Sequence, residues 1–138
     1  MASVGMWPEP VERIAAFLRD AQVEGRIEEL PAGTGSYPGT AVYGAGFEAD
    51  RKRIVALIPS AREVDRTKLA AAAESPALRP APAPAFPFEG ASVFVDRAVF
   101  AGRVVWLEAG SGRHVVGIAP QDLARLTRAK SADLTVDA

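Results

Sequence analysis

Apolar side chains recur every three or four residues between positions 11 and 21, the spacing of one helix face. The stripe consists of Val11, Ile14, Ala15, Phe17, Leu18 and Ala21. Pro10 suits the first helical turn, where its missing N–H would have no partner, and Gly25 is a natural stop. Residues 120–128 repeat the pattern, with Leu123 and Leu126 on one face. Helices are therefore expected near both ends of the chain.

Short apolar runs bounded by Gly, Pro and polar residues lie between these helices and are typical of strands. They cover residues 27–30, 53–58, 92–96, 103–107 and 114–118. The β-branched run at 53–58 ends at Pro59 and favours a buried strand. A turn or short helical piece is expected at residues 98–101.

The segments between these runs are less regular. Residues 31–46 are rich in Gly, and we expect a loop broken by a brief extended piece at 41–43. Phe47 is expected to begin a strand that turns at residues 48–51. Asp65 can cap a helix that continues to residue 73.

Five prolines fall within residues 76–87, where alternating Ala and Pro favour an extended polyproline II conformation. The flanking pieces are too small to be separate domains, so an ordered or semi-ordered surface loop is preferred over a linker. A ligand for an aromatic groove is a weaker alternative for this segment.

The order helix, strands, helix, strands, helix predicts an α/β fold, a single domain with a mixed sheet. The 138 residues suffice for one core. We expect a loose leader over residues 1–9, although Trp7 can pack down. The domain itself is expected over residues 10–134, with a frayed tail over residues 135–138.

Composition removes several classes of function. The 16 basic and 17 acidic residues give no overall nucleic-acid footprint, so any RNA contact needs a local patch. The absence of cysteine excludes thiolate chemistry, and one histidine makes a zinc site implausible. No cofactor or metal is expected. No apolar run approaches transmembrane length, which leads us to expect no membrane partner and a cytoplasmic location.

The turn between the last two predicted strands carries Gly110, Ser111, Gly112, Arg113 and His114. Glycines allow a backbone to approach a ligand closely, and the three polar side chains make a plausible recognition corner. A tight hairpin with a polar tip is an equal alternative. His114 is a candidate general base, or a strand residue with a local hydrogen bond.

Several segments, in order, resemble the YbaK/prolyl-tRNA-editing family of aminoacyl-tRNA deacylases. The resemblance covers most of residues 10–134 and lies in the opening helix, Glu28-Glu29-Leu30-Pro31, residues 54–58, Val64-Asp65-Arg66-Thr67-Lys68-Leu69-Ala70, Val93-Phe94-Val95-Asp96, Ala109-Gly110-Ser111-Gly112-Arg113-His114 and Asp122-Leu123-Ala124-Arg125-Leu126-Thr127. It implies a mixed sheet, partly closed into a barrel and flanked by helices.

The resemblance also implies a site. Tyr43 stands where the family has a lysine, and Gly44 where Ser or Thr is usual. Pro87 retains the end of a Gly-x-x-x-Pro substrate loop, in which Ala83 takes the glycine position. Tyr43 and His114 are the candidate catalytic residues. The candidate substrate-binding residues are Gly44, Pro87, Gly110, Ser111, Gly112 and Arg113.

The function implied is trans-editing, the hydrolysis of the ester of mischarged tRNA. The partners would be mischarged aminoacyl-tRNA and, beside it, an aminoacyl-tRNA synthetase. An alternative is an inactive relative that binds tRNA 3′ ends, a small aminoacyl compound or a protein. Basic side chains that could touch tRNA phosphates are Arg51, Lys52, Arg53, Arg125, Arg128 and Lys130.

Overall fold

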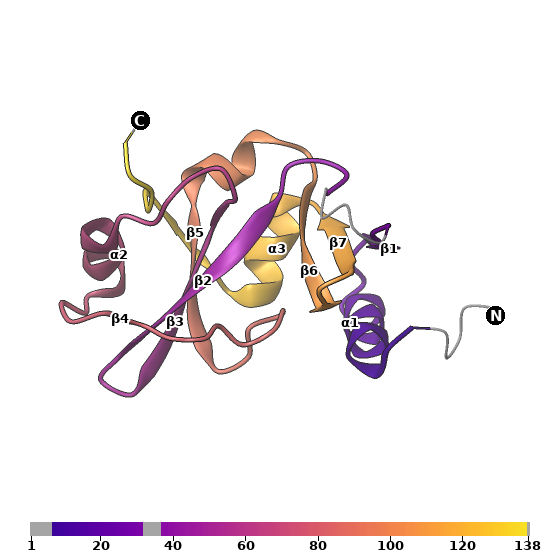
Figure 1. Ribbon diagram of the computed structural model, residues 1–138, viewed down its shortest axis with the longest axis horizontal. Coiled ribbons are helices and arrows are strands. Elements are labelled where there is room, and N and C mark those ends of the chain that lie inside the picture. The colour runs from indigo at the N-terminus through magenta and orange to yellow at the C-terminus, as the bar shows by residue number, and fades with distance from the viewer. Residues whose placement is uncertain (1–6, 32–36, 138) are drawn as a thin grey trace.

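The computed structural model describes residues 7–31 and 37–137 (Figure 1). The elements follow the predicted order of helix, strands, helix, strands and helix. They are α1 (Glu9–Asp20), β1 (Gly25–Glu29), β2 (Val42–Ala49), β3 (Lys52–Pro59), α2 (Arg66–Ala73), β4 (Arg79–Pro80), β5 (Ala91–Asp96), η1 (Arg97–Ala101), β6 (Val105–Ser111), β7 (His114–Ile118), α3 (Pro120–Thr127) and β8 (Lys130–Ala132). Among the helices described, none is long and apolar enough to cross a membrane.

The strands form two sheets that meet along one seam. β1, β7 and β6 make an antiparallel sheet, and the other five strands make a mixed sheet in the order β4-β2-β3-β5-β8. A parallel bridge between Ala41, the residue before β2, and Trp106 of β6 joins the two sheets, and the Trp106 N–H donates to the Thr40 carbonyl at 2.9 Å. This joint closes the sheets partway, which confirms the predicted mixed, partly barrel-like α/β fold.

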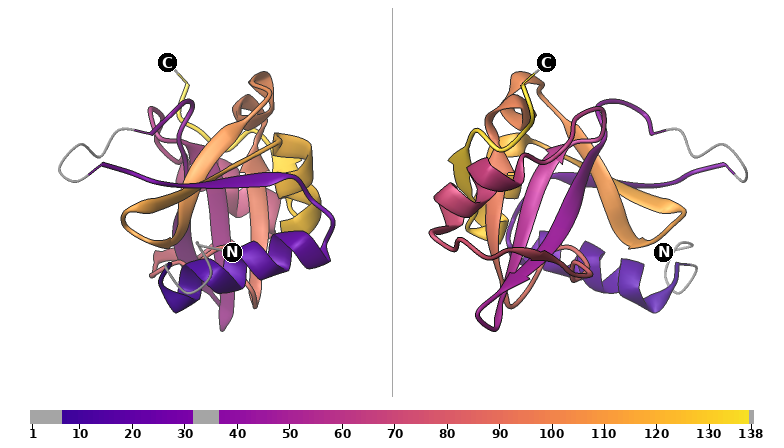
Figure 2. Two further views of the ribbon diagram at one scale, coloured as in Figure 1. Left: turned by 90° about the vertical axis from the view of Figure 1, so that its right-hand side faces the viewer. Right: turned by 60° about the vertical axis from the view of Figure 1, so that its left-hand side comes forward.

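The core lies on both faces of β3, which explains the unbroken apolar run of that strand. Val55 and Leu57 face a cluster shared with α1, α3, β6 and β7. Ile54 and Ile58 face a second cluster, which α2 covers. Figure 1 shows α1 and α2 at opposite ends of the molecule, and Figure 2 shows α1 beside the β6–β7 hairpin. The predicted buried strand is confirmed.

The sequence prediction was wrong for the region of β2. The structure has one continuous strand over Val42–Ala49, instead of a loop that ends at residue 46. Gly46 lies inside it because the Pro-rich loop crosses directly over this position. A Cβ on Gly46 would lie 2.2 Å from the Ala81 carbonyl oxygen. The glycines that indicated a loop therefore serve close packing within a strand.

The predicted end of the first helix, at Gly25, was also wrong. The helix ends at Asp20, and Gln22 takes a positive φ of 56° while the Val23 N–H donates to the Leu18 carbonyl at 3.0 Å. Gly25, the predicted stop, begins β1 instead. A Cβ there would lie 2.7 Å from Leu18 Cδ1, so this glycine permits the helix to pack on the strand.

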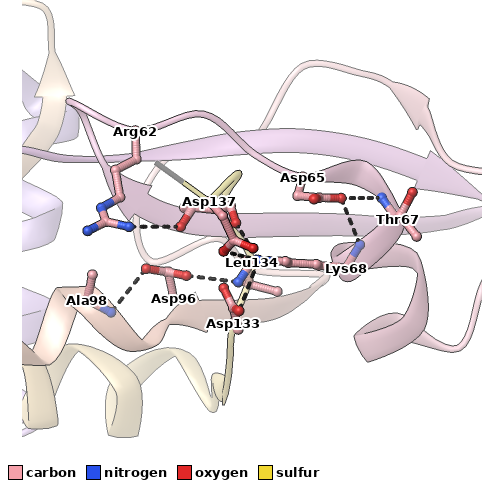
Figure 3. A network of polar contacts seen from close by, with 10 residues as sticks. Arg62, Asp65, Thr67, Lys68, Asp96, Ala98, Asp133, Leu134 and Asp137 are labelled. Carbon is pink, nitrogen blue, oxygen red and sulfur yellow. Dashed lines mark hydrogen bonds and ion pairs between the residues drawn. The ribbon is translucent and has the colours of Figure 1, made fainter.

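The segment after α3 packs against the rest of the domain. Leu134 and Thr135 are buried, and Thr135 pairs with Val64. The buried Asp96 carboxylate accepts the Leu134 N–H at 2.8 Å, and Lys68 binds the Thr135 carbonyl (Figure 3). The last strand, β8, has no apolar signal in the sequence and forms by pairing with β5.

Candidate functional site

A cavity of about 490 Å³ opens where β2 and β6 separate. The two strands touch at Ala41 and Trp106 and then diverge, and the Pro-rich loop reaches into the opening (Figure 1). The cavity is lined by Tyr37, Val42, Tyr43, Gly44, Ala83, Pro84, Ala85, Phe86, Phe88, Leu107, Glu108 and Gly110. Its volume falls in the range of small-molecule sites.

β2 supplies a phenol and an apolar wall. Alternation along the strand buries Val42 and leaves Tyr43 43% exposed. Gly44 faces inward, where a Cβ would lie 3.0 Å from Val55 Cγ1 and 3.2 Å from Phe88 Cε1. The structure thus brings two of the predicted site residues, Tyr43 and Gly44, to the cavity.

The Pro-rich segment is an ordered wall rather than a linker. Phe86 and Phe88 are buried, and their rings meet edge to face at 5.8 Å. The Ala81 N–H donates to the Gly46 carbonyl at 3.0 Å, which ties the loop to β2. Ala83 packs at the position that the resemblance assigns to the loop glycine.

This wall offers hydrogen-bond donors. Among the residues that the structure describes, none accepts a hydrogen bond from the backbone N–H of Ala83, Ala85 or Phe86. Backbone N–H groups that converge on a cavity can stabilise negative charge on a carbonyl oxygen. The three N–H groups belong to residues that line the cavity and have no acceptor in the described chain.

β6 supplies the acidic side of the cavity. Leu107 is buried, and the next residue, Glu108, is exposed at the cavity wall. Burial raises the pKa of Tyr37, and the Glu108 charge raises it further, which places the carboxylate near the phenol. Gly110 has a φ of +91° and lies against Pro10, where a Cβ would meet backbone at 2.9 Å.

The rest of the predicted recognition corner lies away from this cavity. His114 is buried, with Nδ1 hydrogen-bonded to Ser111 Oγ at 2.6 Å and the ring edge to face with Trp7. Arg113 reaches the Leu30 carbonyl at 3.3 Å, and Gly112 is exposed at the hairpin tip. Of the residues in this turn, Gly110 alone lines the cavity.

Pro87 lines a neighbouring groove of about 530 Å³ with Arg128 and Lys130. β5 lies between β3 and β8. Arg53 of β3 pairs with Ala91, and Lys130 of β8 pairs with Phe94. Arg51 and Lys52 lie at the adjoining β2–β3 turn, and all of these cations are exposed. Arg125 instead forms an ion pair with Asp122.

The sequence prediction missed Tyr37 and Glu108. Alternation along β6 could have placed Glu108 on an exposed face, but its proximity to β2 depends on a contact between distant segments. Tyr37 lies in a stretch without periodicity. Within the described residues there is no group of three His, Cys, Asp or Glu that could hold a metal ion.

Neither a family model nor a curated protein sequence matches the chain. Solved structures do match it. A protein proposed to be a trans-editing enzyme for prolyl-tRNA synthetase is 21% identical, with a TM-score of 0.76 over 95% of this chain and 99% of its own. The hypothetical protein APE2540 is 15% identical, with a TM-score of 0.78 over 90% of this chain and 99% of its own.

A scaffold protein used for computational epitope grafting is 18% identical, with a TM-score of 0.79 over 96% of this chain and 100% of its own. At these identities the likeness shows the fold. The chain thus shares its α/β architecture with a protein proposed to act in tRNA editing.

Proposed function

We propose that this protein is an aminoacyl-tRNA deacylase that acts in trans, hydrolysing the ester between a small amino acid and the 3′ end of a mischarged tRNA. The observation that carries the proposal is the cavity itself. It gathers Tyr43, Gly44, Ala83 and Gly110, which stand at positions where the family resemblance implies a site, although the first three differ from the family's usual residues. The fold shared with the trans-editing neighbour supports the same reading.

In this mechanism the loop N–H groups of Ala83, Ala85 and Phe86 hold the ester carbonyl oxygen. Tyr43 donates a further hydrogen bond to that oxygen or to the terminal phosphate. Water attacks the carbonyl carbon, the neighbouring ribose hydroxyl relays a proton, and the ribose oxygen leaves protonated. The products are the free amino acid and uncharged tRNA. The phenol hydroxyl of Tyr43 thus contributes a hydrogen bond where the family's lysine would contribute a positive charge as well.

Exposed cations at one end of the mixed sheet suit the tRNA part of the substrate. Arg51, Lys52, Arg53, Arg128 and Lys130 enter no ion pair with any residue that the structure describes. Unpaired cations of this kind bind phosphates and position a protein on a nucleic acid without recognising its base sequence. We propose that they contact the tRNA backbone while the 3′ end enters the cavity.

A second candidate function is binding without hydrolysis, as in an inactive relative that holds a tRNA end, an aminoacyl compound or a protein. The ionisable groups that line the cavity are Tyr37, Tyr43 and Glu108, so no lysine of the described chain supplies a positive charge there. Loss of one stabilising donor typically costs about 10²–10³ in rate. The same cavity would then retain ligand without turnover.

The test is hydrolysis of a panel of mischarged tRNAs, beginning with alanyl- and cysteinyl-tRNA for proline. Tyr43→Phe should lower turnover about 10²-fold, because it removes one hydrogen bond to the developing charge. Val104→Ala is a matched control, since Val104 is 45% exposed and lies outside the cavity. It should leave turnover unchanged.

Turnover at the spontaneous rate on every substrate would reject the deacylase and leave the binding function. Tyr43→Lys then separates a dormant site from a pure binder. Restored hydrolysis in that variant would show that the scaffold lacks only the charge, and continued inactivity would favour binding.

A further inference from the structure

Glu108 is the one carboxylate among the residues that line the cavity. It lies on β6 directly opposite Val115 of β7, so its cross-strand neighbour offers no charge. No hydrogen bond or ion pair joins Glu108 to another residue of the described chain. The two carboxylates of β1, in the same sheet, do have partners: Glu28 pairs with Arg26 at 2.9 Å and Glu29 with Arg113 at 3.2 Å.

The two strands bring Glu108 and Tyr43 to the same opening. The parallel bridge pairs Ala41 with Trp106, and each site residue lies two positions further along its strand. A step of two residues returns to the same face of a strand. Tyr43 and Glu108 therefore project on one side of the seam, and both line the cavity.

The remaining wall is apolar. Val42, Leu107, Phe86 and Phe88 are buried beside the carboxylate and the two phenols. The cavity thus pairs one negative charge with a small apolar surface, and three of the residues in its wall have backbone N–H groups without an acceptor in the described chain. A ligand that matches it has a cationic group, a short apolar side chain and a carbonyl oxygen.

We infer that Glu108 binds the free α-ammonium group of the aminoacyl ester and so selects substrates with an unblocked amino terminus. The inference rests on the proposed function, and it names the part of the substrate that this carboxylate recognises. The ammonium–carboxylate pair is charge-assisted, which makes it stronger than a neutral hydrogen bond. The raised pKa of Tyr37 agrees with a negative charge held at this wall.

The experiment uses two non-hydrolysable probes, 3′-(L-alanylamino)-3′-deoxyadenosine and its N-acetylated form. N-acetylation removes the positive charge and keeps the carbonyl, side chain and nucleoside. The Kd of each probe is measured by NMR titration for the wild type and Glu108→Gln. Glu89→Gln is the matched control, since Glu89 is exposed on the neighbouring loop and does not line the cavity.

The wild type and Glu89→Gln should bind the free amine about tenfold more tightly than the acetylated probe. Glu108→Gln should bind both probes alike, because the amide keeps the shape and loses the charge. Equal binding of the two probes by the wild type would overturn the inference, as would an undiminished preference in Glu108→Gln. Absence of binding by either probe would also overturn it.

The outcomes separate the inference from the proposed function. A preference for the amine in a protein that hydrolyses no aminoacyl-tRNA would retain the ammonium site and reject the deacylase. Hydrolysis of aminoacyl-tRNA without that preference would retain the deacylase and reject the role of Glu108.

Discussion

At the scale of single residues, the site depends on which side chains can carry charge or donate a hydrogen bond. Tyr43, Tyr37 and Glu108 occupy one cavity, while His114 has a hydrogen bond and a ring contact of its own elsewhere. The resemblance indicated Tyr43 by its position in the chain. Glu108 can be identified as a site residue only from the structure, because the contact between β2 and β6 joins residues far apart in sequence.

Replacement of Glu108 should change the titration of Tyr37. The negative charge of Glu108 raises the pKa of the phenol by disfavouring the phenolate. Glu108→Gln should therefore lower the Tyr37 pKa toward its ordinary value of 10.0, although burial keeps it above that value. Tyrosinate absorbance measures this, since the chain has only two tyrosines. An unchanged titration would show that Glu108 and Tyr37 are not close.

His114→Ala should lower stability and leave hydrolysis unchanged. The substitution removes the partner of Ser111 Oγ and the buried ring that contacts Trp7. The expected cost is about 1–3 kcal/mol in the free energy of unfolding, measured by urea denaturation. Turnover is compared at a temperature where both proteins are folded. A loss of turnover without a loss of stability would instead support His114 as the general base.

At the scale of elements, the sequence predicts those whose pattern is local and misses those that depend on distant partners. The stripe on α1 and the unbroken run of β3 locate both elements correctly. The sequence assigns the first part of β2 to a loop, because Gly44 and Gly46 are typical loop residues. The close packing that requires these glycines becomes visible only in the structure. β8 was missed because pairing with β5, rather than its own side chains, makes it a strand.

Gly46→Ala should displace the Pro-rich loop. An added Cβ would lie 2.2 Å from the Ala81 carbonyl oxygen and 2.6 Å from the Ala83 nitrogen, and neither backbone atom can move alone. We expect a loss of about 1–3 kcal/mol in unfolding free energy and weaker probe binding in the cavity. Gly102→Ala is the control, because its nearest atom would be 3.8 Å away. Equal stability of the two variants would contradict the tight crossing.

The Lys68 cluster should make the attachment of the C-terminal segment depend on pH. Lys68 Nζ lies 3.0 Å from Asp133 and 2.8 Å from Asp137, and these contacts raise the pKa of Lys68 and lower that of Asp133 (Figure 3). The stability that the Asp133 ion pair adds to the fold is present above the ordinary Asp133 pKa of 3.8. It is lost as the pH falls through the lowered pKa of the folded state. The stability that depends on the charge of Lys68 is lost only as the pH rises above 10.5, its ordinary pKa.

Lys68→Met should therefore lower the melting temperature at pH 7 and flatten its decline below pH 3.8. Thermal unfolding from pH 2 to pH 7 measures both effects. A variant whose melting temperature declines as steeply as that of the wild type would show that the lysine does not stabilise the Asp133 carboxylate.

At the scale of the whole molecule, two sheets joined at one seam create the opening, and the Pro-rich loop completes its wall. The exposed cations lie at one end of the mixed sheet, and two of them, Arg128 and Lys130, line the groove that contains Pro87. In the proposed function, the 3′ end of the tRNA enters the cavity while its backbone contacts these cations. The central claim is that the cavity between β2, the Pro-rich loop and β6 receives the aminoacyl end.

The measurement that tests this claim most directly is NMR mapping of the protein with 3′-(L-alanylamino)-3′-deoxyadenosine. The account predicts saturable shifts at Tyr43, Gly44, Ala83 and Glu108, and little change at the amide of His114. The deacylase requires this result, and so does an inactive relative that holds an aminoacyl compound. Shifts confined to the Ser111–His114 turn or to other surfaces, or no saturable shifts at all, would contradict the account.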